Sequence, residues 1–213
     1  MAKPGPKPAD GSAAGTGTRS RIVRAALETL KEAGFAGASA RAIAKKGGFN
    51  PALIFYHFGS VNDALLAGLD ATSEQRMARY QEAVERAKDL PSLLGVAADV
   101  YREDLESGHI TVLAEMIAGA SAVPELGSEI VKRIEPWIRF AEEAASRALG
   151  DTPFAGIAPP RDLAFGIVAL YLGMELLTHL ENDRGRAESL FEVVENVAGL
   201  LLPLLQTTGR NLT

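Results

Sequence analysis

The sequence predicts an all-α protein of about nine helices, with three short helices at the N-terminal end, a long fourth helix and a helical body behind it. Two observations predict this class. Apolar residues recur at three- and four-residue spacing through most of the 213 residues, and no alternating apolar–polar stretch is long enough for a β-sheet. The chain has 47% hydrophobic and 23% charged residues, a composition typical of a soluble globular protein with a real core.

The N-terminal end begins with a segment that lacks any periodic apolar pattern. Residues 1–17 are rich in Pro, Gly, Ala, Ser and Thr, which predicts a disordered tail. Its two lysines leave two interpretations open, a solubilising tail or an arm that reaches a DNA minor groove. A helix is predicted from about Thr18 to Ala33, with Ile22 and Leu30 on one face, and Gly34 is expected to end it.

Two short helices joined by a tight turn are predicted between Ser39 and Phe58. Ser39 is a residue type that caps a helix by accepting a hydrogen bond from an unpaired backbone N–H. Gly47-Gly48 stands where the first of these helices ends, and a positive φ is favourable there. Asn50-Pro51 then starts the second helix, because proline holds the preceding residue extended and fits the first helical turn.

The second short helix has apolar side chains on opposite sides. At about 100° per residue, Ile54 and Phe58 fall on one side and are expected to point inward. The other side carries four apolar residues, Ala52, Leu53, Phe55 and Tyr56. This helix is therefore either buried on both sides or presents an aromatic face, as a recognition helix does in the DNA major groove.

Charge is divided unevenly along the chain. Residues 1–60 contain nine Lys and Arg but three Asp and Glu, a net charge of +6, whereas the rest has a net charge of −11 and the whole chain −5. Such asymmetry is expected when one end meets a polyphosphate. The alternative is a solvated basic face on an ordinary domain, and the two short helices at the same end favour DNA.

Five further helices are predicted behind the long fourth helix, which runs from near Ser60 to about Lys88. Proline and glycine mark most of their boundaries, and the expected ranges are Pro91–Ser107, His109–Ala122, Pro124–Leu149, Arg161–Glu181 and Arg186–Leu205. We expect three parts: a tail at 1–17, a DNA-binding head at 18–64 and a helical body at 65–213.

The Ser39–Phe58 segment resembles the helix–turn–helix of the TetR (tetracycline-repressor) family of bacterial transcription regulators. The resemblance rests on Ile43-Ala44, Gly48-Phe49 and the run IFYHF that ends at Phe58, and it covers about the first third of the chain. It implies a cytoplasmic, ligand-responsive repressor that binds a palindromic operator as a homodimer and is released by a small-molecule effector. Activation rather than repression stays open, as do the operator, the effector and the regulated genes.

Two residues depart from the family pattern. Phe55 stands where the family usually has a Tyr whose hydroxyl reaches a phosphate, and Val61 stands where it usually has a Lys. Each swap removes one expected contact with the DNA backbone. A helical ligand-binding or scaffold protein with lost or weak DNA binding is therefore the alternative function.

The expected DNA contacts follow from residue types on the two short helices. Arg41 is the candidate for a bidentate contact with a base, in particular guanine. Helix N-termini and basic residues are expected at phosphates, a set comprising Ser39, Lys45, Lys46, Asn50 and Pro51. Apolar contacts suited to thymine methyl groups are expected from Ala52, Leu53, Phe55 and Tyr56. His57 either donates to a phosphate or packs at the helix end.

The last two predicted helices are apolar over more of their circumference than one buried face requires. A four-helix interface between two copies would cover both helices, and a deeply buried monomer core is the alternative. The residues expected at this interface are Leu170, Met174, Leu177, Val193, Val197, Leu200, Leu201 and Leu204. A dimer would also supply two heads for half-sites about one helical turn, or a multiple, apart.

The resemblance also implies a small-molecule cavity among the fourth to eighth helices. The candidates for its lining are large or adaptable side chains and two acids within apolar stretches, namely Tyr101, Glu115, Met116, Trp137, Phe140, Tyr171 and Glu175. A buried carboxylate has a high desolvation cost unless it is paired, so either acid could meet a ligand donor. The alternative is that these residues are core, with the acids in salt bridges or facing solvent.

Several other classes of function have no support in the sequence. The chain has no cysteine, and its three histidines lack metal-ligand spacing, so no metal or cofactor is expected. It has no GxSxG, P-loop or Rossmann motif, which argues against an enzyme. It shows no apolar leader, and its longest apolar run, Leu163–Met174, is shorter than the roughly 20 residues of a membrane span, so a soluble cytoplasmic protein without a membrane partner is expected.

Overall fold

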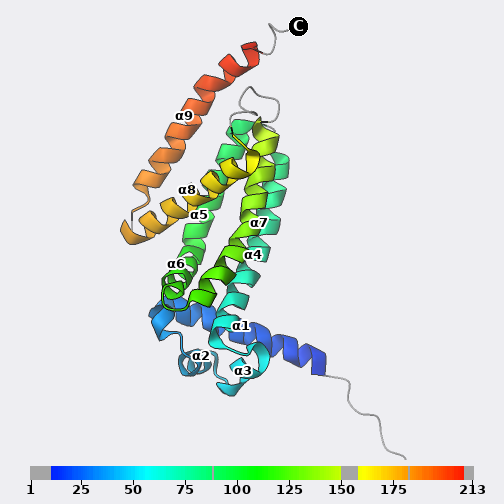
Figure 1. Ribbon diagram of the computed structural model, residues 1–213, viewed down its shortest axis with the longest axis vertical. Helices are drawn as coiled ribbons and strands as arrows, with labels where there is room; N and C mark the ends of the chain where they lie inside the picture. The colour runs from blue at the N-terminus through cyan, green and yellow to red at the C-terminus, as the bar shows by residue number, and fades with distance from the viewer. Residues whose placement is uncertain (1–10, 88, 150–157, 182, 209–213) are drawn as a thin grey trace, which may run out of the picture. The chain divides into compact units, whose positions relative to one another are not determined.

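The computed structural model describes residues 11–87, 89–149, 158–181 and 183–208, and within these ranges the chain forms nine α-helices and no β-strand (Figure 1). The predicted all-α class is confirmed. The chain divides into two compact units at the Leu69–Asp70 junction, and the sequence had placed the end of the head at residue 64.

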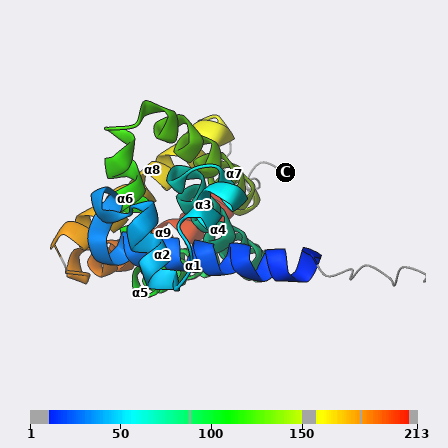
Figure 2. The ribbon, with the colours of Figure 1, turned by 90° about the horizontal axis from the view of Figure 1, so that it is seen from below.

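The first unit contains α1 (Gly11–Gly37), α2 (Ala40–Gly47), α3 (Ala52–Phe58) and the beginning of α4 (Val61–Arg86), which Figure 2 shows from below. Its core is formed by apolar side chains that are fully buried, including Ile22, Ala26, Leu30, Ile43 and Ile54. Gly34 interrupts the helical geometry of α1 with a φ of 70°, as the sequence predicted.

The first helix begins earlier than the sequence predicts. The expected tail reached residue 17, but residues 11–17 belong to α1, and the Ser20 hydroxyl donates to the Thr16 carbonyl within the helix. The physical reason is that Pro8 is the last proline before α1, so every residue from 11 onward keeps its backbone donor. Residues 1–10 of the expected tail lie outside the described residues.

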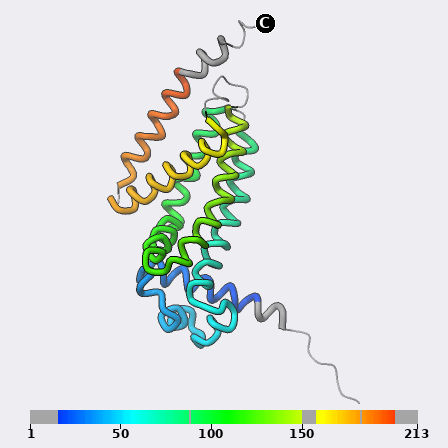
Figure 3. The backbone as a smooth tube through the Cα atoms, in the orientation of Figure 1, coloured from blue at the N-terminus to red at the C-terminus, as the bar shows by residue number. Residues whose placement is uncertain are grey.

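The second unit contains the rest of α4 and five further helices, and Figure 3 traces them in chain order. They are α5 (Leu90–Ser107), α6 (His109–Ala120), α7 (Pro124–Leu149), α8 (Pro160–Glu181) and α9 (Gly185–Thr208). The most extensive packing within this unit is between α7 and α8, followed by α5 and α9. Helix α4 joins α7 through polar contacts, because Arg133 donates to both carboxylate oxygens of Asp70 at 2.7 and 2.9 Å.

The boundaries of these helices follow their capping residues. Ser60 accepts the Asp63 backbone N–H at 3.0 Å ahead of α4, and Asp89 accepts the Ser92 backbone N–H at 2.9 Å ahead of α5. Gly108 has a φ of 68° and separates α5 from α6, which are otherwise continuous. A left-handed residue of this kind ends a helix at little cost only when it is glycine.

Helices α8 and α9 expose an apolar surface that no other described part of the chain covers. It consists of Leu163, Phe165, Ile167, Leu170, Leu177 and Leu180 on α8, and Leu190, Val193, Val194, Val197 and Leu200 on α9. The alternative of a deeply buried monomer core is therefore wrong for these residues. Of the expected interface residues, Met174 is half-buried, and the side chains of Leu201 and Leu204 lie outside the described set.

One described helix, α8, is long and apolar enough to cross a membrane by length and composition alone, and only 17% of its most apolar window is buried. The bent pair of α3 and α4 meets the same criterion when taken as one span. The bounds of α8 agree with the predicted range Arg161–Glu181 to within one residue, and the helix continues past Met174, where the apolar run in the sequence ends. An apolar helix with an uncovered side is also what a helix-to-helix interface between two copies requires.

Candidate nucleic-acid interface and buried carboxylate cluster

The helix α2 begins with the cap that the sequence predicts. Ser39 has extended dihedrals (φ −81°, ψ 157°), and its hydroxyl accepts the backbone N–H of Ala42 at 3.3 Å. At the other end Gly48 is left-handed, with a φ of 65°, and its N–H returns to the carbonyl of Ala44. These two caps fix the length of α2 and the position from which the chain turns toward α3.

The two glycines in this turn have different roles. Gly48 supplies the positive φ, whereas Gly47 remains helical and makes room for a neighbour. A Cβ atom on Gly47 would overlap the Phe49 ring and lie 2.9 Å from the Ala25 Cβ. The turn therefore holds Phe49 close to α1 because residue 47 has no side chain.

The helix α3 starts at Ala52, whose backbone N–H donates to the Asn50 side-chain carbonyl at 2.9 Å. Ile54 is fully buried as predicted, and the opposite side is open, with Phe55 53% and Tyr56 82% exposed. The alternative in which this helix is buried on both sides is wrong for this chain. An aromatic face this exposed on a seven-residue helix is available to a partner.

A residue that the sequence analysis missed holds the end of α3. Arg19, on α1, donates from Nη1 to the His57 carbonyl at 2.9 Å. Its guanidinium also lies 4.2 Å from the centre of the Phe58 ring, which is half-buried. A cation that bonds a C-terminal carbonyl stabilises a short helix. Arg19 therefore positions α3, and the periodicity of α1 alone could not reveal this partner.

The cations of the two short helices differ in availability. Arg41 and Lys45 are exposed and make no ion pair with any residue in the described ranges. Lys46 Nζ, by contrast, lies 2.5 Å from Glu32 Oε1 in an exposed pair. Exposed pairs are weak, so this one only partly restrains Lys46. His57 is half-buried and its ring packs edge-on against Tyr56, with centroids 5.0 Å apart.

A second group of polar residues lies inside the second unit and centres on Asp104 of α5, which has no exposed surface. Arg76 of α4 donates from Nε to Asp104 Oδ1 at 2.6 Å and from Nη2 to Oδ2. The Tyr80 hydroxyl donates to Oδ1 at 2.7 Å and the Tyr171 hydroxyl to Oδ2 at 2.6 Å. Each oxygen of Asp104 thus accepts two hydrogen bonds, which satisfies the carboxylate.

Electrostatics within this group support the ion pair. Burial alone would lower the pKa of Arg76, but the charge of Asp104 raises it above its ordinary value. Burial and the hydrogen bond to Asp104 raise the pKa of Tyr80, so its hydroxyl stays protonated and remains a donor. Arg76 also lies 4.9 Å from the centre of the Trp137 ring. Asp104 was not predicted as a site residue, although its position three residues after Tyr101 places it on the buried side of α5.

Glu175 of α8 completes this group, which we call the Asp104 cluster: Arg76, Tyr80, Asp104, Tyr171 and Glu175. Glu175 is 2% exposed, and its Oε1 has no hydrogen-bond partner among the described residues. Burial, followed by the charge of Asp104, raises the pKa of Glu175 to about 8, while the Tyr171 hydroxyl and Arg76 act in the opposite direction. The carboxyl group of Glu175 is therefore mostly protonated at pH 7.

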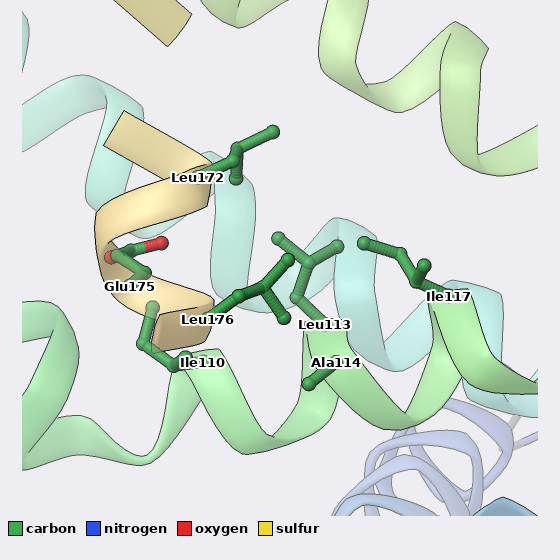
Figure 4. A pocket seen from close by; sticks show the side chains of 7 residues that line it. All are labelled: Ile110, Leu113, Ala114, Ile117, Leu172, Glu175 and Leu176. Carbon is green, nitrogen blue, oxygen red and sulfur yellow. The ribbon is translucent and has the colours of Figure 1, made fainter. Parts of the chain in front are cut away.

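Glu175 lines a small cavity between α6 and α8 (Figure 4). The other residues that line it are all apolar: Ile110, Leu113, Ala114, Ile117, Leu172 and Leu176. The space open to the centre of a water molecule is about 10 Å³, room for about one water.

Glu175 is the one residue of the expected cavity set that lines this space. Tyr101 and Met116 are buried, Tyr101 within 2.5 Å of the Thr178 hydroxyl, and Tyr171 belongs to the Asp104 cluster. Trp137 and Phe140 pack edge-on with centroids 6.2 Å apart, and Glu115 is half-buried. The apolar lining was missed because its leucines and isoleucines look like any core residues in the sequence.

Comparisons with known proteins agree with this arrangement. Residues 22–67 match the sequence model of the family described as bacterial regulatory proteins, tetR family. The HTH-type transcriptional regulator UidR of Escherichia coli K12 is 37% identical over 68 residues, which are 32% of this chain. The match spans 35% of that relative's length, about a third.

Solved structures with the same fold cover most of the chain. A TetR-family transcriptional regulator from Cytophaga hutchinsonii aligns with a TM-score of 0.72 at 16% identity, over 89% of this chain and 97% of that one. A transcriptional regulator from Saccharomonospora viridis, solved in complex with choline, aligns with a TM-score of 0.68 at 18% identity, over 86% of this chain and 95% of that one. The chain thus carries the helix–turn–helix domain of the bacterial TetR family at its N-terminal end, on the all-α fold of that family's regulators.

Proposed function

We propose that the chain is a transcription regulator that binds a palindromic DNA operator as a homodimer and responds to a small-molecule effector. The observation that carries the proposal is the exposed side of α3, with Phe55 and Tyr56 open, beside the unpaired cations Arg41 and Lys45 of α2. Apolar and aromatic groups read thymine methyls in the major groove, and cations supply phosphate and guanine contacts. The domain's family supports the same function.

The proposed dimer is supported by the apolar surface of α8 and α9. Leu170, Leu177 and Val197 are each between 47% and 60% exposed, and they belong to a set of eleven exposed apolar residues on two consecutive helices. Extensive exposed apolar surface marks an interaction site in a soluble protein. A self-complementary twofold contact would cover it with the same residues of a second copy.

The proposed effector response is supported by the interior of the second unit. A buried acid with an unsatisfied oxygen lies at a cavity there. The Saccharomonospora viridis regulator, which shares this fold, was solved in complex with choline, and this supports the proposal. We propose a cytoplasmic repressor that the effector releases from DNA. A coupling free energy on the order of 1–3 kcal/mol between effector and DNA is sufficient to change occupancy substantially.

Two residues support the alternative function, a helical ligand-binding or scaffold protein with lost or weak DNA binding. Phe55 and Val61 cannot make the hydroxyl and ammonium contacts that the family usually makes. The two proposals differ in whether the protein binds specific fragments of genomic DNA. Fragments of the source genome selected on the full chain should share an inverted repeat under our proposal, and the scaffold proposal expects no enrichment of any sequence.

Replacing Arg41 by alanine is expected to weaken binding to the selected operator by roughly 1–3 kcal/mol and to relax the preference at one base pair per half-site. The reason is that a bidentate guanidinium–guanine contact distinguishes one base from the others. A gel-shift titration against the operator and its single-base variants measures both effects. Lys45→Ala is the matched control, because a lost phosphate contact should weaken all these duplexes alike. Unchanged affinity and specificity in Arg41→Ala would show that Arg41 makes no base contact.

A further inference from the structure

The number of charges in the Asp104 cluster is unbalanced. Two carboxyl groups, Asp104 and Glu175, share the interior with one guanidinium, that of Arg76. Arg76 directs Nε and Nη2 to Asp104, which also receives two tyrosine hydroxyls. Arg76 and Tyr80 thus direct their hydrogen bonds to Asp104, the Tyr171 hydroxyl acts on both Asp104 and Glu175, and Oε1 of Glu175 accepts none.

The position of Glu175 makes this imbalance costly. A carboxylate without a counter-ion in an apolar site is disfavoured by several kcal/mol or more, which is why such groups take up a proton. The remaining lining of the cavity offers no compensation, because the α6 side contributes Ile110, Leu113, Ala114 and Ile117 and the α8 side adds two leucines (Figure 4). Oε1 lacks both a hydrogen-bond donor and a counter-charge. A ligand group that carries an N–H donor and a positive charge would supply both.

From this geometry we infer that the cavity between α6 and α8 binds a small apolar molecule that carries one protonated amine, with the ammonium group donating to Glu175 and the hydrocarbon part lying among Ile110, Leu113 and Leu176. This inference rests on the proposed function, because it takes the bound molecule to be the effector. A primary or secondary ammonium is favoured over a quaternary one, because Oε1 lacks a hydrogen-bond donor as well as a charge.

The cavity is too small for an alkylamine unless the protein changes conformation on binding. It has room for about one water, so an alkylamine enters only if side chains of α6 and α8 move apart. Tyr171 and Thr178 lie about one turn from Glu175 on α8, and they contact Asp104 and Tyr101 of α5. A displacement of α8 by the ligand would therefore act on the contacts that join α8 to α5.

The proposed binding of an ammonium group should also depend on pH. The ionisable groups that act on Glu175 are Asp104 of α5, Tyr171 of α8 and Arg76 of α4, and α6 contributes apolar side chains to the cavity. The pKa of Glu175 is raised to about 8 in the free protein. Binding an ammonium group must therefore expel a proton below this pH, and affinity should rise by up to about tenfold per pH unit up to pH 8 and then level off.

The test uses the full chain and three six-carbon probes: hexylammonium, 1-hexanol and hexanoate. Isothermal titration calorimetry should find hexylammonium bound at least tenfold more tightly than 1-hexanol at pH 8.5, and hexanoate bound most weakly. In Glu175→Gln the preference for hexylammonium over 1-hexanol should fall to about one. Glu181→Gln, an exposed acid on the same helix, is the matched control and should keep the preference.

Several outcomes would overturn the inference. Equal affinity for hexylammonium and 1-hexanol in the unmodified chain would do so without any variant, as would affinity for hexylammonium that is flat between pH 6 and 8. A preference that survives Glu175→Gln would place the cation elsewhere. DNA binding is measured separately: a chain that binds DNA but not hexylammonium contradicts this inference alone, whereas one that binds hexylammonium but no DNA contradicts the proposed function alone.

Discussion

Asp104→Asn is expected to lower the free energy of unfolding by about 3–5 kcal/mol, because it leaves the buried Arg76 guanidinium without its counter-charge. The amide keeps the shape of the carboxylate but replaces one acceptor oxygen by a donor. Arg76 and either Tyr80 or Tyr171 then face an N–H group at hydrogen-bond distance. Urea unfolding at one fixed protein concentration measures the loss, since association contributes to apparent stability.

The matched control lies on the same helix. Asp99 also pairs with an arginine, Arg102 at 2.7 Å, but both side chains are more than half exposed. Asp99→Asn should therefore change the free energy of unfolding by less than about 1 kcal/mol. If both substitutions changed the free energy of unfolding by equal, small amounts, the Asp104 ion pair would not stabilise the second unit.

Val197→Glu is expected to convert the proposed dimer to a monomer at micromolar concentration. Val197 is 47% exposed in one chain and would be buried against the second copy among apolar side chains of α8 and α9. A twofold axis places the substitution in the interface twice. Burying an unpaired charge costs several kcal/mol, so the dissociation constant should rise by about two orders of magnitude or more.

Sedimentation velocity across a range of concentrations measures this change. Val131→Glu is the control, because Val131 is 65% exposed but lies on α7 and does not belong to the apolar set of α8 and α9. Equal dimer dissociation constants for the two variants would refute the assignment of α8 and α9 as the interface. A monomeric unmodified chain would refute it as well.

Local sequence signals predicted the first unit well. Ser39, Gly48 and Asn50 act within a few residues of their own position, so their capping roles follow from residue type. The burial of Ile54 and the exposure of Tyr56 follow from helical periodicity in the same way. Arg19 escaped prediction because its partner carbonyl, that of His57, is 38 residues away in sequence.

The second unit was predicted less completely, because its polar contacts join distant helices. Helix ends marked by Gly108 and Pro124 were evident in the sequence. The pairing of Arg76 with Asp104, however, depends on how α4 packs against α5, which no spacing within one helix specifies. Glu175 was singled out as an acid within an apolar stretch, and its burial without a partner for Oε1 could only come from the three-dimensional structure.

The proposed function requires the basic head to bind duplex DNA, and this binding should depend steeply on salt concentration. With Arg41, Lys45 and Lys46 contributed by each of two heads, affinity for a genomic duplex should fall by on the order of 10³ between 50 and 200 mM salt. A gel-shift or anisotropy titration of the full chain at several salt concentrations provides the measurement. We expect tight binding at low salt with this steep decline, and failure to bind any genomic duplex at 50 mM salt would contradict DNA binding by the head.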